Sequence, residues 1–139
     1  MGTRIRTFAA GLVVALLIAG CGDAGAPAIT GQGVLDQFRA AGLQIDNIKP
    51  ARNEMKQMPQ GYKENLAFTT PSLGDKGGQV FVCDVKAGCD AIYAYFDGMK
   101  ALAGPYLYQS PSGMVVVQLN SGLDPVEAAR YEAVVRGLP

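Results

Sequence analysis

The 139-residue sequence contains no histidine and no tryptophan, and only three cysteines. Without histidine, neither a Ser-His-Asp triad nor an HExxH zinc site can form, and the most common general base is missing. Basic and acidic residues number twelve each, so the chain lacks the excess positive charge typical of nucleic-acid-binding proteins. We therefore expect no nucleic-acid partner, no bound metal and no cofactor.

The first 20 residues have the three parts of a secretory signal peptide. Arg4 and Arg6 provide the positive start, and residues 8–19 form an apolar run. This run is too short to cross a bilayer, which needs about 20 residues. It leads into Leu17-Ile18-Ala19-Gly20-Cys21, which resembles the lipobox of bacterial lipoproteins: an aliphatic residue, a small residue, Gly or Ala, then Cys.

The resemblance implies that the chain is cut before Cys21 and that the Cys21 sulfur carries a diacylglyceryl group. Membrane lipid is then the first expected partner, since two or three acyl chains give a stable anchor. The chain is expected to be extracytoplasmic and anchored to a bacterial membrane. Gly22 departs from the aspartate that retains enteric lipoproteins in the inner membrane, which slightly favours the outer membrane in a Gram-negative source. An ordinary signal peptide or short membrane helix with an incidental cysteine is the alternative.

The two other cysteines, Cys83 and Cys89, are separated by five residues that include Gly88. If Cys21 is acylated, the remaining pair is even, and an extracytoplasmic compartment permits a disulfide between them. We expect this disulfide. Two free buried thiols are the alternative, while a redox or metal pair is disfavoured because the spacing is not CxxC and further ligands are lacking.

Removal of residues 1–20 leaves 119 residues with a net charge of −2. This length suits one small domain. Residues 21–33 comprise the lipidated cysteine and a short tether rich in glycine and alanine, and residues 34–139 form the expected domain. Because the tether is short, we expect the domain to lie close to the membrane surface.

Hydrophobic periodicity and turn residues predict the order α-β-β-β-α-β-β-α. Asp90 is expected to cap the second helix, and Asp124 followed by Pro125 to open the last. The sequence thus predicts an α+β two-layer sandwich, with a mainly antiparallel sheet of about five strands covered on one face by about three helices. The expected elements are a helix at 34–41, strands at 43–49, 65–69 and 79–85, a helix at 91–103, strands at 106–109 and 114–119, and a helix at 125–138.

Three tyrosines are candidates for a partner surface. Tyr93 lies off the apolar stripe of its helix, and Tyr106 and Tyr108 point to one side of their strand. If that side is the open face of the sheet, they offer an aromatic patch to a protein or glycan. If helices cover it, they belong to the core, which we favour for at least one of them.

No motif predicts catalysis. The Gly-rich segment 74–78 contains Lys76, but a P-loop has its lysine after the glycines and leads into a helix, whereas here a strand is expected to follow. Asp84 and Asp90 are expected at a strand end and a helix cap, so they are not interpreted as an acid pair or calcium site. A small enzyme using Asp, Glu or Lys is the least favoured alternative, and we predict that the chain is not an enzyme.

The domain is also similar to a set of uncharacterised small bacterial lipoproteins, a resemblance that implies no activity. It rests on residues 38–43, on residues 71–74 leading to 78–82, and on residues 115–120. We therefore expect a membrane-anchored, non-catalytic binding or envelope-associated domain. The alternative is an inhibitor or accessory subunit that docks on another envelope protein, which predicts an exposed apolar patch on the open sheet face.

Overall fold

The computed structural model describes residues 27–51 and 56–139, so the candidate lipidation residue Cys21 lies outside the described residues. The described helices and strands follow the predicted order, except that the helix predicted at 91–103 begins earlier and is divided into two helices, and that a 3₁₀ turn follows the second strand. In chain order they are α1 (Gly31–Ala40), β1 (Asp46–Pro50), β2 (Glu64–Thr69), the 3₁₀ turn η1 (Pro71–Leu73), β3 (Gly77–Val82), α2 (Lys86–Gly98), α3 (Lys100–Ala103), β4 (Leu107–Gln109), β5 (Val115–Leu119) and α4 (Pro125–Arg136).

The strands form one five-stranded sheet in the order β1-β2-β3-β5-β4, and every neighbouring pair is antiparallel. This confirms the predicted α+β class with its antiparallel sheet. The connections β2–β3 and β4–β5 are hairpins, as the turn residues between them predict. Strands β1 and β4 are therefore the two outer edges.

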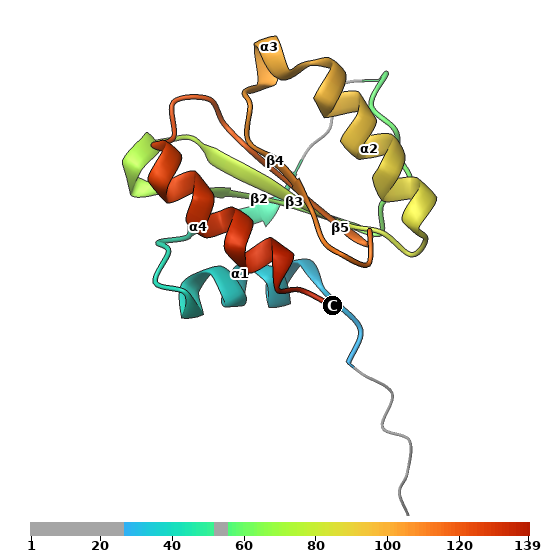
Figure 1. Cartoon of the computed structure of the whole chain (residues 1–139), viewed down its shortest axis with the longest axis horizontal. Helices are drawn as coiled ribbons and strands as arrows, with labels where there is room; N and C mark the ends of the chain where they lie inside the picture. The colour runs from blue at the N-terminus through green and yellow to red at the C-terminus, as the bar shows by residue number, and fades with distance from the viewer. Residues whose placement is uncertain (1–26, 52–55) are drawn as a thin grey trace, which may run out of the picture.

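The two-layer prediction placed all the helices on one face of the sheet, whereas the structure places them on both faces. Helices α1 and α4 cover one face, and α2 packs on the opposite face (Figure 1). The reason lies in the central strands, which are apolar at successive positions. Val80 and Val82 point toward α1 and α4, while Phe81 between them points toward α2. A strand buried on both sides needs a helical layer on each side.

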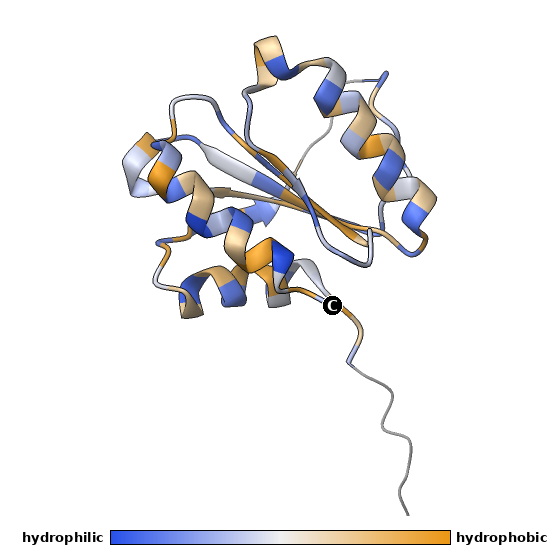
Figure 2. Cartoon of the chain, in the orientation of Figure 1, coloured by the Kyte–Doolittle hydropathy of each residue, from blue (hydrophilic) through white to orange (hydrophobic). Residues whose placement is uncertain are grey.

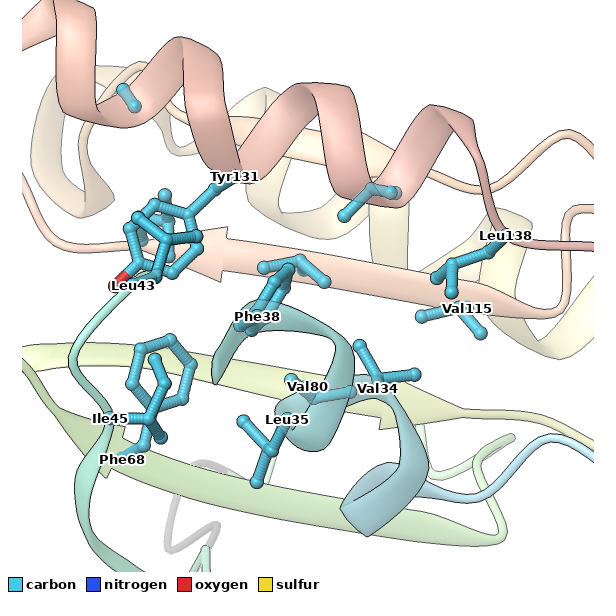
Figure 3. Close-up of a cluster of buried hydrophobic side chains, with 14 of the residues drawn as sticks. Val34, Leu35, Phe38, Leu43, Ile45, Phe68, Val80, Val115, Tyr131 and Leu138 are labelled. Atoms are coloured by element: carbon cyan, nitrogen blue, oxygen red, sulfur yellow. The ribbon is translucent and has the colours of Figure 1, made fainter. Parts of the chain in front are cut away.

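The larger hydrophobic cluster fills the space between the sheet and helices α1 and α4 (Figure 3). Phe38 of α1 lies at its centre, with ring centroids 4.9 Å from Tyr131 of α4 and 6.2 Å from Phe68 of β2. All three side chains are buried. This aromatic contact joins one strand and two helices that are distant in the sequence.

The smaller cluster lies between the sheet and α2. Ile92 and Phe96 of the helix pack on Phe81 of β3 and Val116 of β5, with the Phe81 and Phe96 ring centroids 5.7 Å apart. The hydropathy colouring shows largely apolar central strands between the two helical layers, and helices in which polar and apolar residues alternate along the ribbon (Figure 2).

Side-chain caps define where α1 and α4 begin. Thr30 Oγ1 accepts from the N–H of Gly33 at 3.0 Å, so α1 starts three residues before the predicted boundary at 34, and residues 31–33 are helical. Asp124 caps α4 as predicted, accepting from the N–H of Val126 at 2.8 Å, with Pro125 in the first helical turn.

The prediction that Asp90 caps the second helix is wrong. Helix α2 begins at Lys86 after Val85, whose side chain makes no capping bond. Asp90 lies one turn inside the helix, where its carboxylate accepts from Lys86 Nζ at 2.7 Å and from Gln109 Nε2 at 2.9 Å. These hydrogen bonds hold the pKa of Asp90 below its ordinary value. The carboxylate links α2 to the β4–β5 hairpin instead of capping the helix.

Candidate functional site

The predicted disulfide is present. Cys83 follows β3, Cys89 lies in the first turn of α2, and their sulfurs are bonded with Cα atoms 5.8 Å apart. Both residues are buried, at 3% and 0% exposure, within the smaller cluster. The bond therefore ties the start of α2 to the central strand, and its place in the core indicates a structural role.

The three candidate tyrosines do not form one exposed patch. Tyr106 and Tyr108 are partly buried against the larger cluster, on the face covered by α1 and α4, which is the core alternative left open by the sequence. Tyr93 is partly buried beside the smaller cluster on the other face. Burial, together with the negative charge of Glu132, raises the pKa of Tyr108 to about 12.

Tyr93 and Tyr108 nevertheless meet at one edge of the sheet. Together with Leu107 and Gln109 of β4 and two residues of α4, Glu132 and Arg136, they line a hollow of about 470 Å³. Tyr106 is not among its lining residues. The structure thus brings together two of the three predicted surface tyrosines, one from each side of strand β4. This hollow is called the β4 slot below.

A larger groove, of about 750 Å³, lies where α2 leaves the sheet uncovered. Its walls come from β1, β2, β3, the loop before β3 and the residue after β5. Polar side chains predominate; they are Asn47, Lys49, Thr69, Asp75, Lys76, Gln79 and Asn120. We call this the amide groove, because asparagine and glutamine amides contribute from both edges and the floor.

Three amide side chains form a row across the sheet beside and beneath this groove. Asn65 Nδ2 donates to Gln79 Oε1, and Gln79 Nε2 donates to Gln118 Oε1, each at 3.4 Å. Gln118 in turn donates to the carbonyl oxygens of Ala103 and Leu119, at 2.9 and 2.8 Å. The buried Asn65 Oδ1 has no hydrogen-bond partner among the described residues. The row fixes the orientation of Gln79 in the groove.

The groove walls are held by shorter hydrogen bonds. Asn47 Nδ2 donates to Thr69 Oγ1 at 2.9 Å, and Asn120 Oδ1 accepts from the N–H of Gly77 at 3.1 Å. These bonds leave Asn47 Oδ1 as an acceptor and Asn120 Nδ2 as a donor for a ligand. Lys49 and Lys76 form no ion pair with any described residue, so their ammonium groups are also free to donate.

The amide groove was missed by the sequence analysis. Its signal is the placement of Gln79 and Gln118 in strands that are otherwise strongly apolar. A glutamine in a central strand needs a polar partner or a wet surface, and the two are paired directly across β3 and β5. Two paired polar side chains in central strands mark the part of the sheet that no helix covers, but the pairing itself is known only from the tertiary structure.

Within residues 27–51 and 56–139 no group of three or more Cys, Asp or Glu side chains could hold a metal ion. Over the same residues, no helix has the length and hydropathy needed to cross a membrane.

Comparison of the chain with protein-family models, with curated proteins and with solved structures finds no match.

Proposed function

We propose that the protein is a lipid-anchored, extracytoplasmic binding domain without catalytic activity, and that the amide groove is its ligand site. The observation that carries the binding role is the groove itself, in which fixed amides, and lysines that form no ion pair with the described residues, present both donors and acceptors. Sites for small polar ligands are typically concave and use a few oriented polar groups in this way.

The groove chemistry supports binding over catalysis. Asp75 is the one carboxylate among its lining residues, so the described walls lack the paired carboxylates of an acid–base site. Lys49 and Lys76 also line the groove, but neither forms an ion pair with Asp75 among the described residues, so no carboxylate–lysine pair is assembled there. We therefore favour recognition of a polar ligand by hydrogen bonds over its conversion.

The lipid anchor is supported by two features of the chain. The first is the lipobox resemblance at residues 18–21, and the second is the Cys83–Cys89 disulfide, which is typical of proteins outside the cytoplasm. The N-cap Thr30 is only nine positions after Cys21 in the sequence. A fully extended chain of that length reaches about 30 Å, so the anchor would hold the groove close to the membrane.

The alternative role, an inhibitor or accessory subunit, was expected to show an apolar patch on the open sheet face. The described part of that face is the amide groove, which is polar. The large exposed hydrophobic residues of the described chain are scattered instead: Val85 before α2, Leu102 in α3 and Val126 in α4. Docking through the open sheet face is therefore not favoured.

The anchor is tested by intact mass of the full chain extracted from bacterial membranes. We expect cleavage before Cys21, an added diacylglyceryl mass, and a loss of two hydrogens at Cys83 and Cys89. A Cys21→Ser variant should leave the membrane fraction. Recovery of unmodified wild-type chain from the soluble fraction would refute the anchor and leave the groove proposal untouched.

The groove is tested by a thermal-shift screen of small polar compounds and envelope saccharides. A ligand should raise the Tm of the wild-type protein, as any ligand of the native state does. The shift should fall in a Lys49→Ala or Lys76→Ala variant and persist in the control Lys100→Ala, whose lysine lies outside the groove. Equal shifts in all variants, or no shift with any compound, would contradict the proposal.

A further inference from the structure

The two edges of the sheet differ in how they are protected against pairing. In β1, Pro50 has no N–H to donate, and Asn47 has φ of +48° at a point where the register with β2 shifts. Proline and irregular backbone of this kind discourage strand addition at an edge. Strand β4 has neither feature; only its length of three residues limits pairing there, and its register with β5 is regular.

The pairing of β4 with β5 determines which of its main-chain groups face outward. The carbonyl of Tyr106 accepts from Leu119 N at 2.9 Å, and Ser110 N donates to the carbonyl of Val115 at 3.0 Å. Main-chain groups of successive strand residues point to opposite sides, so those of Leu107 and Gln109 point away from β5. No described residue forms a backbone hydrogen bond with these N–H and C=O groups.

The β4 slot lies along this outward row of groups. Tyr93 and Leu107 form its side toward α2, and Tyr108 forms its side toward α4. Beyond Tyr108, Arg136 Nε donates to Glu132 Oε1 at 3.0 Å, which places an ion pair at the rim. One side of the slot is therefore aromatic and aliphatic, and the other combines a tyrosine with charged groups.

We propose that the β4 edge binds an extended segment of a partner protein, which adds to the sheet as a sixth strand. Its main chain pairs with Leu107 and Gln109, as in other cases of strand addition. Its side chains alternate, with apolar ones against Tyr93 and Leu107 and polar or charged ones toward Glu132 and Arg136. A single extended segment fits the short β4 edge between α2 and α4. A second copy would have to bring its own α2 and α4 to the same short edge.

This inference is independent of the amide groove. Only the location of the partner, an envelope protein beside the membrane, rests on the proposed lipid anchor. Loss of groove binding or of lipidation would therefore leave strand addition at β4 intact.

Hydrogen exchange provides the direct test. Short random peptides displayed on phage are selected against the full mature protein, and the amides of β4 are then followed in free and bound protein. The N–H of Tyr108, paired with β5, should be protected in both states. The N–H groups of Leu107 and Gln109 should exchange faster than that of Tyr108 in free protein and become protected on binding.

Three results would overturn the proposal. One is that no peptide is enriched. Another is that bound peptides protect neither Leu107 nor Gln109. The third is that these amides become protected in the free protein as its concentration rises, which would assign the edge to a second copy of the chain. This measurement uses the wild-type sequence, so it does not depend on any variant folding.

A pair of variants separates main-chain pairing from side-chain contact. Gln109→Pro removes the outward N–H, and Gln109→Ala keeps that N–H while removing the side-chain bonds to Asp90 and Gly113. If the peptide pairs with the edge, Gln109→Pro should weaken binding about tenfold beyond Gln109→Ala, the effect of one lost hydrogen bond. Equal affinities of two folded variants would contradict main-chain pairing.

Discussion

The two faces of the sheet are buried to different extents. Toward α1 and α4, the cluster contains 16 buried residues and includes the Phe38–Tyr131–Phe68 ring contacts. Toward α2 it contains eight, two of which are the disulfide cysteines. The first face combines the larger apolar cluster with hydrogen bonds such as that from Arg130 Nη2 to the carbonyl of Ala41, at 2.9 Å. The second combines a smaller apolar cluster with a covalent bond.

This difference relates stability to function. Because α2 covers only part of its face, the remaining strands are free to carry the amide groove. The face with two helices supplies most of the buried hydrophobic residues in the described part of the chain. We infer that the larger cluster stabilises the domain as a whole, while the smaller one positions α2 beside the groove and the β4 slot.

The largest expected effect is from Phe38→Ala, in the larger cluster. Loss of the phenyl ring leaves a cavity between Phe68 and Tyr131 and should lower the free energy of unfolding by about 4 kcal/mol. Denaturant unfolding measures this change. The control is Val126→Ala, at a side chain 74% exposed, with an expected change within about 0.5 kcal/mol. A small effect of Phe38→Ala would show that the larger cluster is not the stabilising one.

Phe96→Ala tests the smaller cluster in the same way. The ring contacts Phe81 and Tyr95, and its loss should cost about 3 kcal/mol. If the cluster mainly positions α2, hydrogen exchange should quicken in α2 more than in α4, because α4 packs on the larger cluster, which keeps all its side chains. Uniform acceleration in both helices would show that the two clusters form one cooperative unit.

The disulfide is expected to contribute less than either ring. Cys83 and Cys89 are six positions apart, and closing so short a loop stabilises a domain by about 2 kcal/mol. A Cys83→Ala/Cys89→Ala double variant should lose this amount in denaturant unfolding. Reductant should destabilise the wild-type protein similarly and leave the double variant unchanged. If reductant has no effect on the wild-type protein, the bond does not stabilise the smaller face.

The order of helices and strands could be predicted from the sequence because each element carries a local signal. Asp124 followed by Pro125 marks the start of α4 by side-chain capping and a fixed φ, and both act within a single turn. The disulfide followed from cysteine parity and compartment, which are also independent of the fold. Lipidation of Cys21 stays a prediction.

The side of the sheet that each helix covers could not be predicted in this way. Every helix has one apolar face, so the helices alone fit either side. The available signal was in β5, where Val115, Val116 and Val117 are consecutive apolar residues and so require burial on both faces. The Asp90 prediction failed for a related reason: its partners include Gln109, 19 residues away, which local sequence does not indicate.

The candidate site depends on the same long-range pairing. Gln79 and Gln118 are 39 positions apart, and only the β3–β5 register places them side by side. The β4 slot likewise combines Tyr93 from α2 with Glu132 and Arg136 from α4. Two of the three tyrosines were identified from the sequence, but their meeting at a sheet edge required the topology.

The smallest expected effect concerns the helix caps, where the two faces differ again. On the larger cluster, α4 has a capping side chain in Asp124. On the smaller one, the N-cap position of α2 is Val85, which is 62% exposed and forms no capping bond. Val85 has the extended backbone that a capping residue adopts, with φ of −135° and ψ of 142°.

Val85→Ser should therefore stabilise the domain by about 0.5 kcal/mol, and Asp124→Ala should destabilise it by about 1 kcal/mol. Thermal or denaturant unfolding measures both. Val85→Thr, which keeps a β-branched side chain and adds the hydroxyl, should reproduce part of the gain. If both Val85 variants destabilise the domain, the exposed valine side chain itself contributes to stability. The missing cap would then not be what limits the stability of α2.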